Sequence, residues 1–193
     1  NCIKFELTNE GLYLLSTDNE LAIKSFIPAS EIEEIDTMGD MLISGRYIYD
    51  IVRKLTGEVI NIEEIIDSQV LITTDSSSFK LNCNEVNEFP SIDLDFTGTP
   101  VLMDKKVFKT TINQTIFATS TQENRPEFTG INIVIEKNKM ECTATDSYRL
   151  AKKHIELDNV YEENINIIIP NKNIVELERM IIDNDEALEI HIF

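Results

Sequence analysis

The chain has 193 residues, with 35 acids and 17 bases, and its formal net charge at pH 7 is −18. A hydrophobic content of 42% excludes a disordered chain, and the acidity argues against non-specific attraction to nucleic acid unless the few bases gather on one face. No apolar run is long enough to cross a membrane and no signal peptide is recognisable, so a cytoplasmic protein without a membrane partner is expected.

Strands and helices alternate along the chain in two similar series. Short stretches of alternating polarity, rich in β-branched residues, predict strands at 3–7, 13–17, 21–26, 59–65, 70–74, 79–83, 131–136, 165–170 and 188–193. Helical spacing of apolar residues predicts helices at about 45–55, 104–118 and 171–182. The loop 84–100, with two prolines, a glycine and several acids, is typical of a linker. We therefore expect domains at 1–96 and 97–193.

The first and last predicted helices repeat each other at a distance of 126 positions. Each has an apolar stripe and a basic-acidic-basic polar face, although any amphipathic helix has such stripes. The matching pairs are Arg46 and Lys172, Ile48 and Ile174, Asp50 and Glu176, Ile51 and Leu177, Arg53 and Arg179, and Leu55 and Ile181. In the first helix Val52 also falls on the stripe. A Thr-Asp pair recurs at nearly the same distance, at 17–18 and 145–146. The sequence therefore predicts an α+β fold of duplicated domains.

The repeat also indicates that each copy lacks a part. The helix at 104–118 has its counterpart before residue 1, and the segment 68–96 has its counterpart after residue 193. The chain begins with Asn1 rather than methionine. We therefore expect a piece of a longer protein.

Residues with metal-binding or catalytic chemistry are sparse. Cys2, Cys83 and Cys142 show no C-x-x-C spacing, and the two histidines are 37 positions apart, so no metal, cofactor or disulfide framework is expected. Asp93 and Asp95 form a D-x-D, which keeps a metal-dependent nucleic-acid-processing enzyme open as an alternative. A structural repeat module that does not bind DNA is a second alternative. No phosphate-binding loop or nucleophile motif is present, which favours a protein without catalytic activity.

Three stretches carry a family resemblance. They are IFATSTQENRPEFTGINI (116–133), ATDSYRLA (144–151) and IIIPNKNIVELERM (167–180), and they resemble the beta subunit of bacterial DNA polymerase III, the sliding clamp. The resemblance implies a DNA-clamp fold, in which antiparallel sheets form the outside of each domain and two helices face a DNA channel. It further implies three domains per subunit, of which this chain would hold most of the first two.

The same resemblance implies the partners. Two subunits would close head to tail as a homodimer around double-stranded DNA, after loading by a clamp loader, and would tether the replicative DNA polymerase catalytic subunit. The clamp itself would be a processivity factor of the polymerase without catalysis of its own.

The resemblance also implies a DNA-facing set of residues. The bases on the repeated helices, those on the helix at 104–118 and two residues of the following loop would face DNA, whereas each base alone is equally consistent with a solvated helix face. The set is Arg46, Arg53, Lys105, Lys109, Gln122, Arg125, Lys172 and Arg179. Asn171 stands where clamps often have a further base.

Two protein-binding sites follow from the resemblance. A hydrophobic cleft for short peptides would be formed by Phe128, Thr145, Ser147, Tyr148, Arg149 and Leu150, although the apolar members could also be ordinary core residues. Asp146 is interpreted as a turn residue that accepts backbone N–H groups, as is Asp18 in TDNEL (17–21), which lacks the arginine and the aromatic residue. An edge strand at 76–82, with Phe79 and Leu81, would close the ring against the other subunit.

Overall fold

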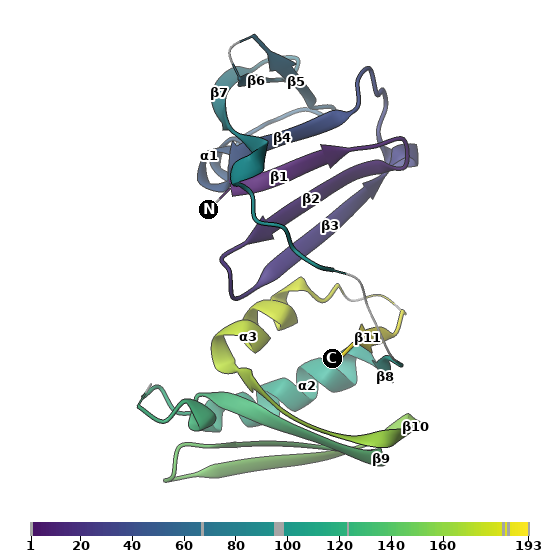
Figure 1. The fold of residues 1–193 in the computed structure, drawn as a ribbon, viewed down its shortest axis with the longest axis vertical. Coiled ribbons are helices and arrows are strands. Elements are labelled where there is room, and N and C mark those ends of the chain that lie inside the picture. The colour runs from purple at the N-terminus through teal and green to yellow at the C-terminus, as the bar shows by residue number, and fades with distance from the viewer. Residues whose placement is uncertain are drawn as a thin grey trace. The chain divides into compact units, whose positions relative to one another are not determined.

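Two compact units make up the chain. The computed structural model describes residues 2–66, 68–94, 99–122, 124–182, 184 and 186–192. The units are Asn1–Leu94 and Asp95–Phe193 (Figure 1). The boundary predicted near residue 96 lies outside the described residues.

The first unit is an antiparallel sheet with one α-helix among its described residues. The strands follow each other in space in the order β3-β2-β1-β4-β7-β6-β5. Their bounds are β1 Cys2–Leu7, β2 Gly11–Thr17, β3 Ala22–Pro28, β4 Gly39–Ser44, β5 Asn61–Ile65, β6 Gln69–Thr73 and β7 Ser78–Asn84. Helix α1 is Gly45–Val52, and short 3-10 turns lie at Ala29–Glu31 and Val86–Glu88. Strand β4 was not predicted, because its apolar run Met41–Ile43 is too short to show a period.

Helix α1 packs on the sheet through one side only. Ile48 is buried in a cluster with Phe5, Ile43, Val70 and Ile72, and Ile51 packs against that cluster. Burial of an isoleucine side chain contributes about 1.5–3 kcal/mol, which is enough to hold a helix of two turns that would not be stable alone. Val52 is exposed, so its predicted place in the apolar stripe is wrong.

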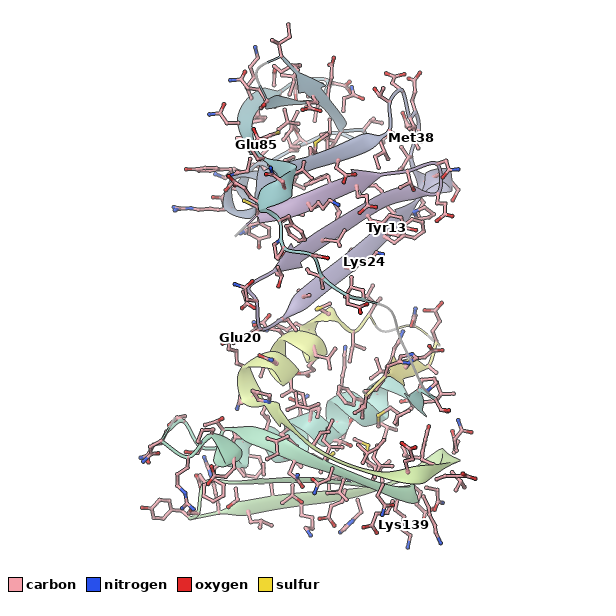
Figure 2. All side chains as sticks on the ribbon, viewed as in Figure 1. Tyr13, Glu20, Lys24, Met38, Glu85 and Lys139 are labelled. Carbon is pink, nitrogen blue, oxygen red and sulfur yellow. The ribbon has the colours of Figure 1, made fainter. Side chains whose placement is uncertain are left out.

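Strands β2 and β3 carry an aromatic pair, and Figure 2 labels Tyr13 of this pair and the neighbouring Lys24. Tyr13 and Phe26 are paired in the sheet register, and their rings stack with centroids 4.5 Å apart. The Lys24 ammonium lies 4.4 Å from the centroid of the Tyr13 ring, and the Tyr13 hydroxyl donates to Glu10 at 3.0 Å. Cross-strand aromatic contacts of this kind stabilise a two-strand pairing by up to about 1 kcal/mol.

The second unit places two helices over a long strand pair (Figure 1). Its elements are β8 Val101–Met103, α2 Lys105–Thr115, 3-10 turns η3 Ile116–Ala118 and η4 Pro126–Phe128, β9 Gly130–Thr145, β10 Leu150–Pro170, α3 Asn171–Met180 and β11 Leu188–Ile190. Asp104 caps α2 by accepting from the backbone N–H groups of Lys106 and Val107 at 2.8 and 2.9 Å. Strand β8 was not predicted, and among the described strands it pairs with β11 alone.

The core of the second unit joins the helices to β9. Phe108 and Ile112 of α2 and Ile174 of α3 are fully buried with Ile131 and Ile135 of β9. On the surface the amide of Asn113 in α2 donates to the Glu178 carboxylate in α3 at 2.8 Å. The two helices are therefore held to the sheet by apolar burial and to each other by a polar contact.

The predicted internal repeat is confirmed by the structure. Helix α1 begins at Gly45 and α3 at Asn171, 126 positions later, and the equivalent residues Ile48 and Ile174 are both buried. Strands β9 and β10 pair in two registers, 139–145 with 150–156 and 130–135 with 165–170. Between them Lys137, with φ of 56°, pairs with Tyr161 at an irregularity of the sheet.

Each of the two registers reproduces one pairing of the first unit. Thr145 with Leu150 repeats Thr17 with Ala22 of β2 and β3. Likewise, the pairing of Ile131 with Ile169 repeats that of Ile3 with Ile43, which joins β1 to β4. The same strand pairs therefore occur in both units, in the same order along the chain.

The three thiols are expected to react with iodoacetamide in an order set by burial. Burial raises the pKa of Cys142 to about 12, so at pH 8 about one thiol in ten thousand is ionised, and its side chain is inaccessible. Burial also raises the pKa of Cys83, with a further contribution from Glu64. We expect Cys2 to label first, Cys83 more slowly and Cys142 only after unfolding, as read by peptide mass spectrometry. Native labelling of Cys142 at the rate of Cys83 would contradict the buried position.

Candidate functional site

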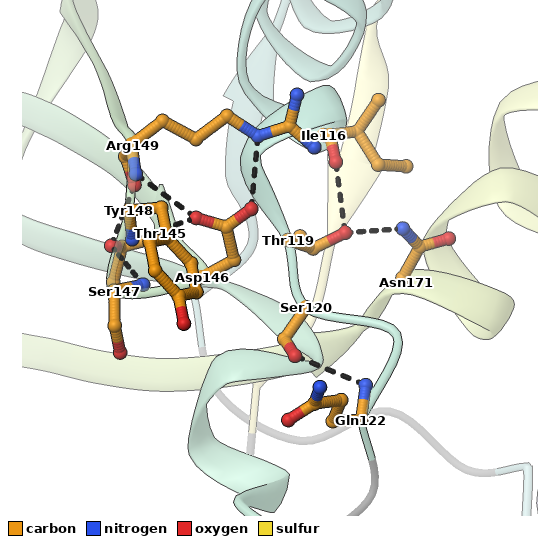
Figure 3. A network of polar contacts seen from close by, with 10 residues as sticks. All are labelled: Ile116, Thr119, Ser120, Gln122, Thr145, Asp146, Ser147, Tyr148, Arg149 and Asn171. Carbon is orange, nitrogen blue, oxygen red and sulfur yellow. Dashed lines mark hydrogen bonds and ion pairs between the residues drawn. The ribbon is translucent and has the colours of Figure 1, made fainter.

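A pair of equivalent turns follows β2 and β9. In the second unit Asp146 Oδ1 accepts from the backbone N–H groups of Tyr148 and Arg149, both at 3.0 Å (Figure 3). In the first unit Asp18 Oδ1 accepts from the second and third residues after it at 3.1 and 2.8 Å. The interpretation of both aspartates as turn residues is therefore confirmed.

The threonine before each aspartate closes the same turn. Thr145 Oγ1 donates to the Arg149 carbonyl oxygen at 2.7 Å and accepts from the Ser147 N–H at 3.2 Å. Thr17 makes the equivalent two bonds at 2.9 and 3.0 Å. The third residue of each turn, Ser147 or Asn19, has φ near 75°, at 77° and 73°. A short polar residue tolerates this left-handed conformation, which explains the residue types found there.

Only the second turn carries exposed apolar side chains. Tyr148 is 97% exposed and Leu150 is 63% exposed, so neither belongs to the core. Phe117 of η3 is 57% exposed, and its ring centroid lies 5.7 Å from the Arg149 guanidinium carbon. Sequence reasoning missed Phe117. The feature that could have indicated it is an aromatic residue just after the end of α2. Tyr148, Phe117 and Leu150 thus form an uncovered apolar surface on and beside the turn.

The Arg149 guanidinium is held in place by an ion pair. Its Nε donates to Asp146 Oδ2 at 3.0 Å, while the other oxygen of that carboxylate serves the turn (Figure 3). The backbone N–H groups of Arg149 and Tyr148 lower the pKa of Asp146, and the Arg149 guanidinium lowers it further. The carboxylate therefore fixes the turn and orients the arginine together.

Replacing Asp146 with asparagine is expected to release Arg149 while keeping the turn. An amide oxygen can still accept the two backbone N–H groups, but it has no charge for the guanidinium. The pKa of Asp146 is lower in the folded protein than in the unfolded chain. Its ionised form therefore stabilises the turn fully at any pH above the unfolded pKa, and this stabilisation is lost as the pH falls through the folded pKa. We expect Asp146→Asn to speed hydrogen exchange of the Arg149 Nε–H. The variant should also abolish the change in the Arg149 NMR signals that accompanies protonation of Asp146 at low pH.

The matched control is Asp18→Asn in the equivalent turn of the first unit, where Leu21 stands in place of Arg149. That variant should leave the Arg149 NMR signals, and their change at low pH, as they are in the wild type. A similar change of the Arg149 signals in both variants would mean that the ion pair does not hold the guanidinium.

Phe128 ends the 3-10 turn η4, in the loop between η3 and β9. Its ring is half-buried under the Arg125 guanidinium carbon, at 4.3 Å from the ring centroid, and Arg125 Nε also lies 3.4 Å from Glu127. The Phe128 carbonyl oxygen accepts from the Ser120 N–H at 2.7 Å, two residues after η3 ends. The structure thus joins Tyr148, Arg149 and Leu150 at one turn and places Phe128 at the end of the loop that follows η3.

The polar face of α1 carries two tyrosines beside the predicted bases. Arg46 and Arg53 are exposed, with Asp50 between them, and the Arg53 guanidinium carbon lies 5.1 Å from the ring centroid of Tyr49. Tyr47 is also exposed. Sequence reasoning treated this face by charge alone and missed its aromatic content.

The predicted bases of the second unit differ in how available they are. Lys172 and Arg179 of α3 are exposed, and Arg179 forms an ion pair with Glu176 at 2.6 Å. Lys109 is half-buried on α2. Lys105 has a side chain only 13% exposed, and its ammonium donates to Asn184 and lies 3.8 Å from Glu186. Gln122 is exposed, and its backbone N–H donates to the hydroxyl of Ser120.

Strand β7 is an edge strand along part of its length. In strand order it lies between β4 and β6, and its last two residues, Cys83 and Asn84, pair with β4, just beyond the predicted edge segment 76–82. Its segment 78–82 pairs with β6 alone among the described strands, so Phe79 and Leu81 stand on a segment with one unpaired side. A cavity of about 380 Å³ adjoins this segment and is lined by Ser44, Tyr47, Lys80, Leu81, Asn82 and Asn84.

The alternative of a metal-dependent enzyme needs a cluster of metal-ligating side chains. No three His, Cys, Asp or Glu side chains in the described ranges are placed to hold a metal ion together. Asp93 is exposed, and its D-x-D partner Asp95 lies outside the described residues. None of the described helices is both long enough and apolar enough to cross a membrane.

Comparison with known proteins gives two family matches. Residues 1–93 match the model of the N-terminal domain of the DNA polymerase III beta subunit, and residues 102–193 match that of its central domain. A protein of Staphylococcus aureus named "Beta sliding clamp" is 35% identical over 192 residues, covering 97% of this chain and 51% of that protein.

Solved structures agree with this result. A DNA polymerase sliding clamp from Bacillus subtilis superposes with a TM-score of 0.92 at 31% identity, over 100% of this chain and 52% of that one. The DNA polymerase III beta chain of Streptococcus pneumoniae superposes with a TM-score of 0.91 at 28% identity, over 97% of this chain and 51% of that one. The chain spans about half the length of these relatives, and it belongs to the DNA polymerase III beta subunit family.

Proposed function

We propose that this chain forms most of the first two domains, at 1–96 and 97–193, of a three-domain sliding clamp. The clamp would close head to tail with a second copy around double-stranded DNA, after opening by a clamp loader, and would tether the replicative DNA polymerase catalytic subunit. The observation that carries this proposal is the duplicated unit, with the same strand pairs, turn and helix start in both copies, in a member of this family. Repeated units of one shape are what a closed ring with pseudo-symmetry requires.

The DNA-facing surface would be the polar faces of the helices and the loop after η3. Arg46, Arg53, Lys172 and Arg179 supply exposed bases there, and Asp50 and Glu176 interrupt the positive charge. A weakly positive lining suits a protein that slides, because each fixed phosphate contact adds affinity and slows movement. Lys105 contributes less to this proposal than the other bases, since its ammonium is held by Asn184 and is largely buried.

The peptide-binding cleft would be centred on the second turn. Tyr148 and Leu150, with Phe117, offer apolar surface to short peptides of the polymerase and other partners, and Arg149 offers N–H donors to peptide carbonyls. Thr145 and Ser147 would act by shaping the turn, and Phe128 by bounding the cleft from the neighbouring loop. The first turn has Glu20 and Ala22 at the places of Tyr148 and Leu150, so we assign no cleft to it.

Ring closure would use the unpaired side of β7. Addition of a strand from the second copy would satisfy the free backbone groups of 78–82 and cover Phe79 and Leu81. We assign no catalytic activity, cofactor or metal to the chain and place its work in the cytoplasm, where bacterial DNA is replicated.

The experiment that tests the ring uses the full-length protein that carries this chain. The protein is loaded onto nicked circular plasmid with a clamp loader, the plasmid is linearised, and retention is followed by gel filtration. Retention on circles with loss from linear ends is expected of a topological clamp. Equal retention on both forms would mean ordinary electrostatic binding and would overturn the ring.

A matched pair of variants tests the closing surface in the same assay. Phe79→Asp should abolish retention on circles, because it introduces a charge at the unpaired side of β7. Ile62→Asp on β5 serves as the control, since Phe79 and Ile62 are both 37% exposed. Equal loss of retention on circular DNA with both variants would mean that a charge disrupts the sheet itself rather than closure of the ring.

A further inference from the structure

Asn171 ties both ends of the loop between η3 and β9. The two ends of the loop are joined where the Ser120 N–H donates to the Phe128 carbonyl oxygen at 2.7 Å. We call this closed base of the loop, Thr119–Ser120 with Phe128–Thr129, the neck. The Asn171 backbone N–H donates to the Thr129 carbonyl oxygen at 2.9 Å, and its side-chain Nδ2 donates to Thr119 Oγ1 at 2.5 Å (Figure 3). One residue at the start of α3 therefore forms hydrogen bonds with both the first and the last part of the loop.

The side-chain bond at the neck is partly buried, on the side of Thr119. Thr119 is buried, and its hydroxyl donates to the Ile116 carbonyl oxygen at 2.8 Å, so its oxygen has an acceptor position left for Asn171. Loss of this bond would leave an acceptor position of a buried hydroxyl without its partner, which costs stability. In the first unit the equivalent position is Gly45, which has no side chain to make this contact.

The neck lies between residues assigned to different partners. Arg125 and Gln122 are within the loop and Lys172 follows Asn171 directly, and all three belong to the proposed DNA-facing set. Phe128, which closes the neck through its own carbonyl oxygen, belongs to the proposed peptide cleft. A shift of the neck would therefore move residues of both surfaces.

We propose that Asn171 is a positioning residue that sets the neck of this loop and thereby couples the DNA-facing surface to the peptide cleft. The inference rests on the proposed function for the two surfaces, whereas the neck itself is defined by hydrogen bonds alone. It assigns to Asn171 a role through Thr119 and Thr129 rather than through contact with DNA.

Two substitutions separate positioning from stability. Asn171→Ala removes the side-chain donor. Asn171→Asp also removes it, because a carboxylate only accepts and the Thr119 hydroxyl is already used on Ile116. A carboxylate in the first turn of α3 interacts favourably with the helix dipole, so Asn171→Asp should not lower the melting temperature. A loosened neck without loss of stability would be the sign of positioning.

The test measures amide hydrogen exchange and binding in the full-length protein. We expect exchange at Ser120 to rise about fivefold in both variants, as for the loss of one neutral hydrogen bond, and affinity for a fluorescent polymerase-derived peptide to fall several-fold. Thr119→Val should raise exchange at Ser120 at least as much, because it also loses the bond to the Ile116 carbonyl oxygen, and adding Asn171→Ala to it should give no further rise. Asn173→Ala, two positions further along α3, is the control that should change neither reading.

Each failure has its own meaning. Unchanged exchange at Ser120 in both variants would overturn the positioning role. Faster exchange with unchanged affinity for peptide and for nicked DNA would overturn the coupling, with the proposed function intact. Absence of peptide binding by the wild-type protein would count against the proposed function instead, and the exchange result would still decide the role of Asn171 at the neck.

Discussion

Gly11→Ala is expected to unfold the first three strands of the chain. Gly11 has φ of 147°, a conformation that residues with a Cβ rarely adopt, and a Cβ there would lie 2.1 Å from the Ile27 carbonyl oxygen. Two further contacts, at 2.9 Å each, are also with backbone atoms, so no side chain can move to make room. Backbone strain costs about 1–3 kcal/mol and overpacking about 1–3 kcal/mol, so a loss of about 2–6 kcal/mol of folding free energy is expected.

Amide hydrogen exchange gives the measurement, because it reports each strand separately. Protection should be lost along β1, β2 and β3 and kept along β9 and β10, which have a separate core. Gly57→Ala is the matched control, since Gly57 has φ of 135° but its added Cβ would meet nothing nearer than 3.8 Å. Equal losses in the two variants would show that backbone conformation, rather than the close approach to β3, sets the cost.

The repeat could be predicted because its signals are local. The Thr-Asp turn depends on side chains that bond to backbone groups two to four residues away, so the residue types alone predict the geometry. The buried sides of α1 and α3 follow from apolar spacing within a single helix. Patterns of this range are visible in one sequence without knowledge of the rest of the fold.

What was missed depends on distant contacts. Phe117 belongs to the candidate site only because η3 lies beside the turn that carries Arg149, 32 positions later. Lys105 has the spacing of an exposed base, and only the approach of Asn184 shows that its ammonium is occupied. The divided pairing of β7 between β4 and β6 likewise depends on strands far apart in the sequence. Side-chain type does not encode such contacts, so only the folded chain reveals them.

The turn that carries the proposed cleft permits a test in which binding and stability separate. Tyr148 and Leu150 are exposed, so truncation of either to alanine should change the free energy of unfolding by no more than about 0.5 kcal/mol. Apolar anchors at the centre of an interface each cost about 2 kcal/mol or more on truncation, which corresponds to about a thirtyfold weaker peptide. We expect this loss for Leu150→Ala and for Tyr148→Ala, measured by fluorescence polarisation with a polymerase-derived peptide on the full-length protein.

Val160→Ala is the control for this pair. Val160 lies on the same strand as Leu150 and is 69% exposed, close to the 63% of Leu150, but it lies beyond the first pairing register of β10. It should therefore bind peptide as the wild type does. Unchanged affinity in both site variants, with the fold intact, would mean that the exposed turn is not the cleft. A loss confined to Leu150→Ala would instead place the apolar anchor on the strand side of the turn, with Tyr148 at the solvated rim, where truncation costs little.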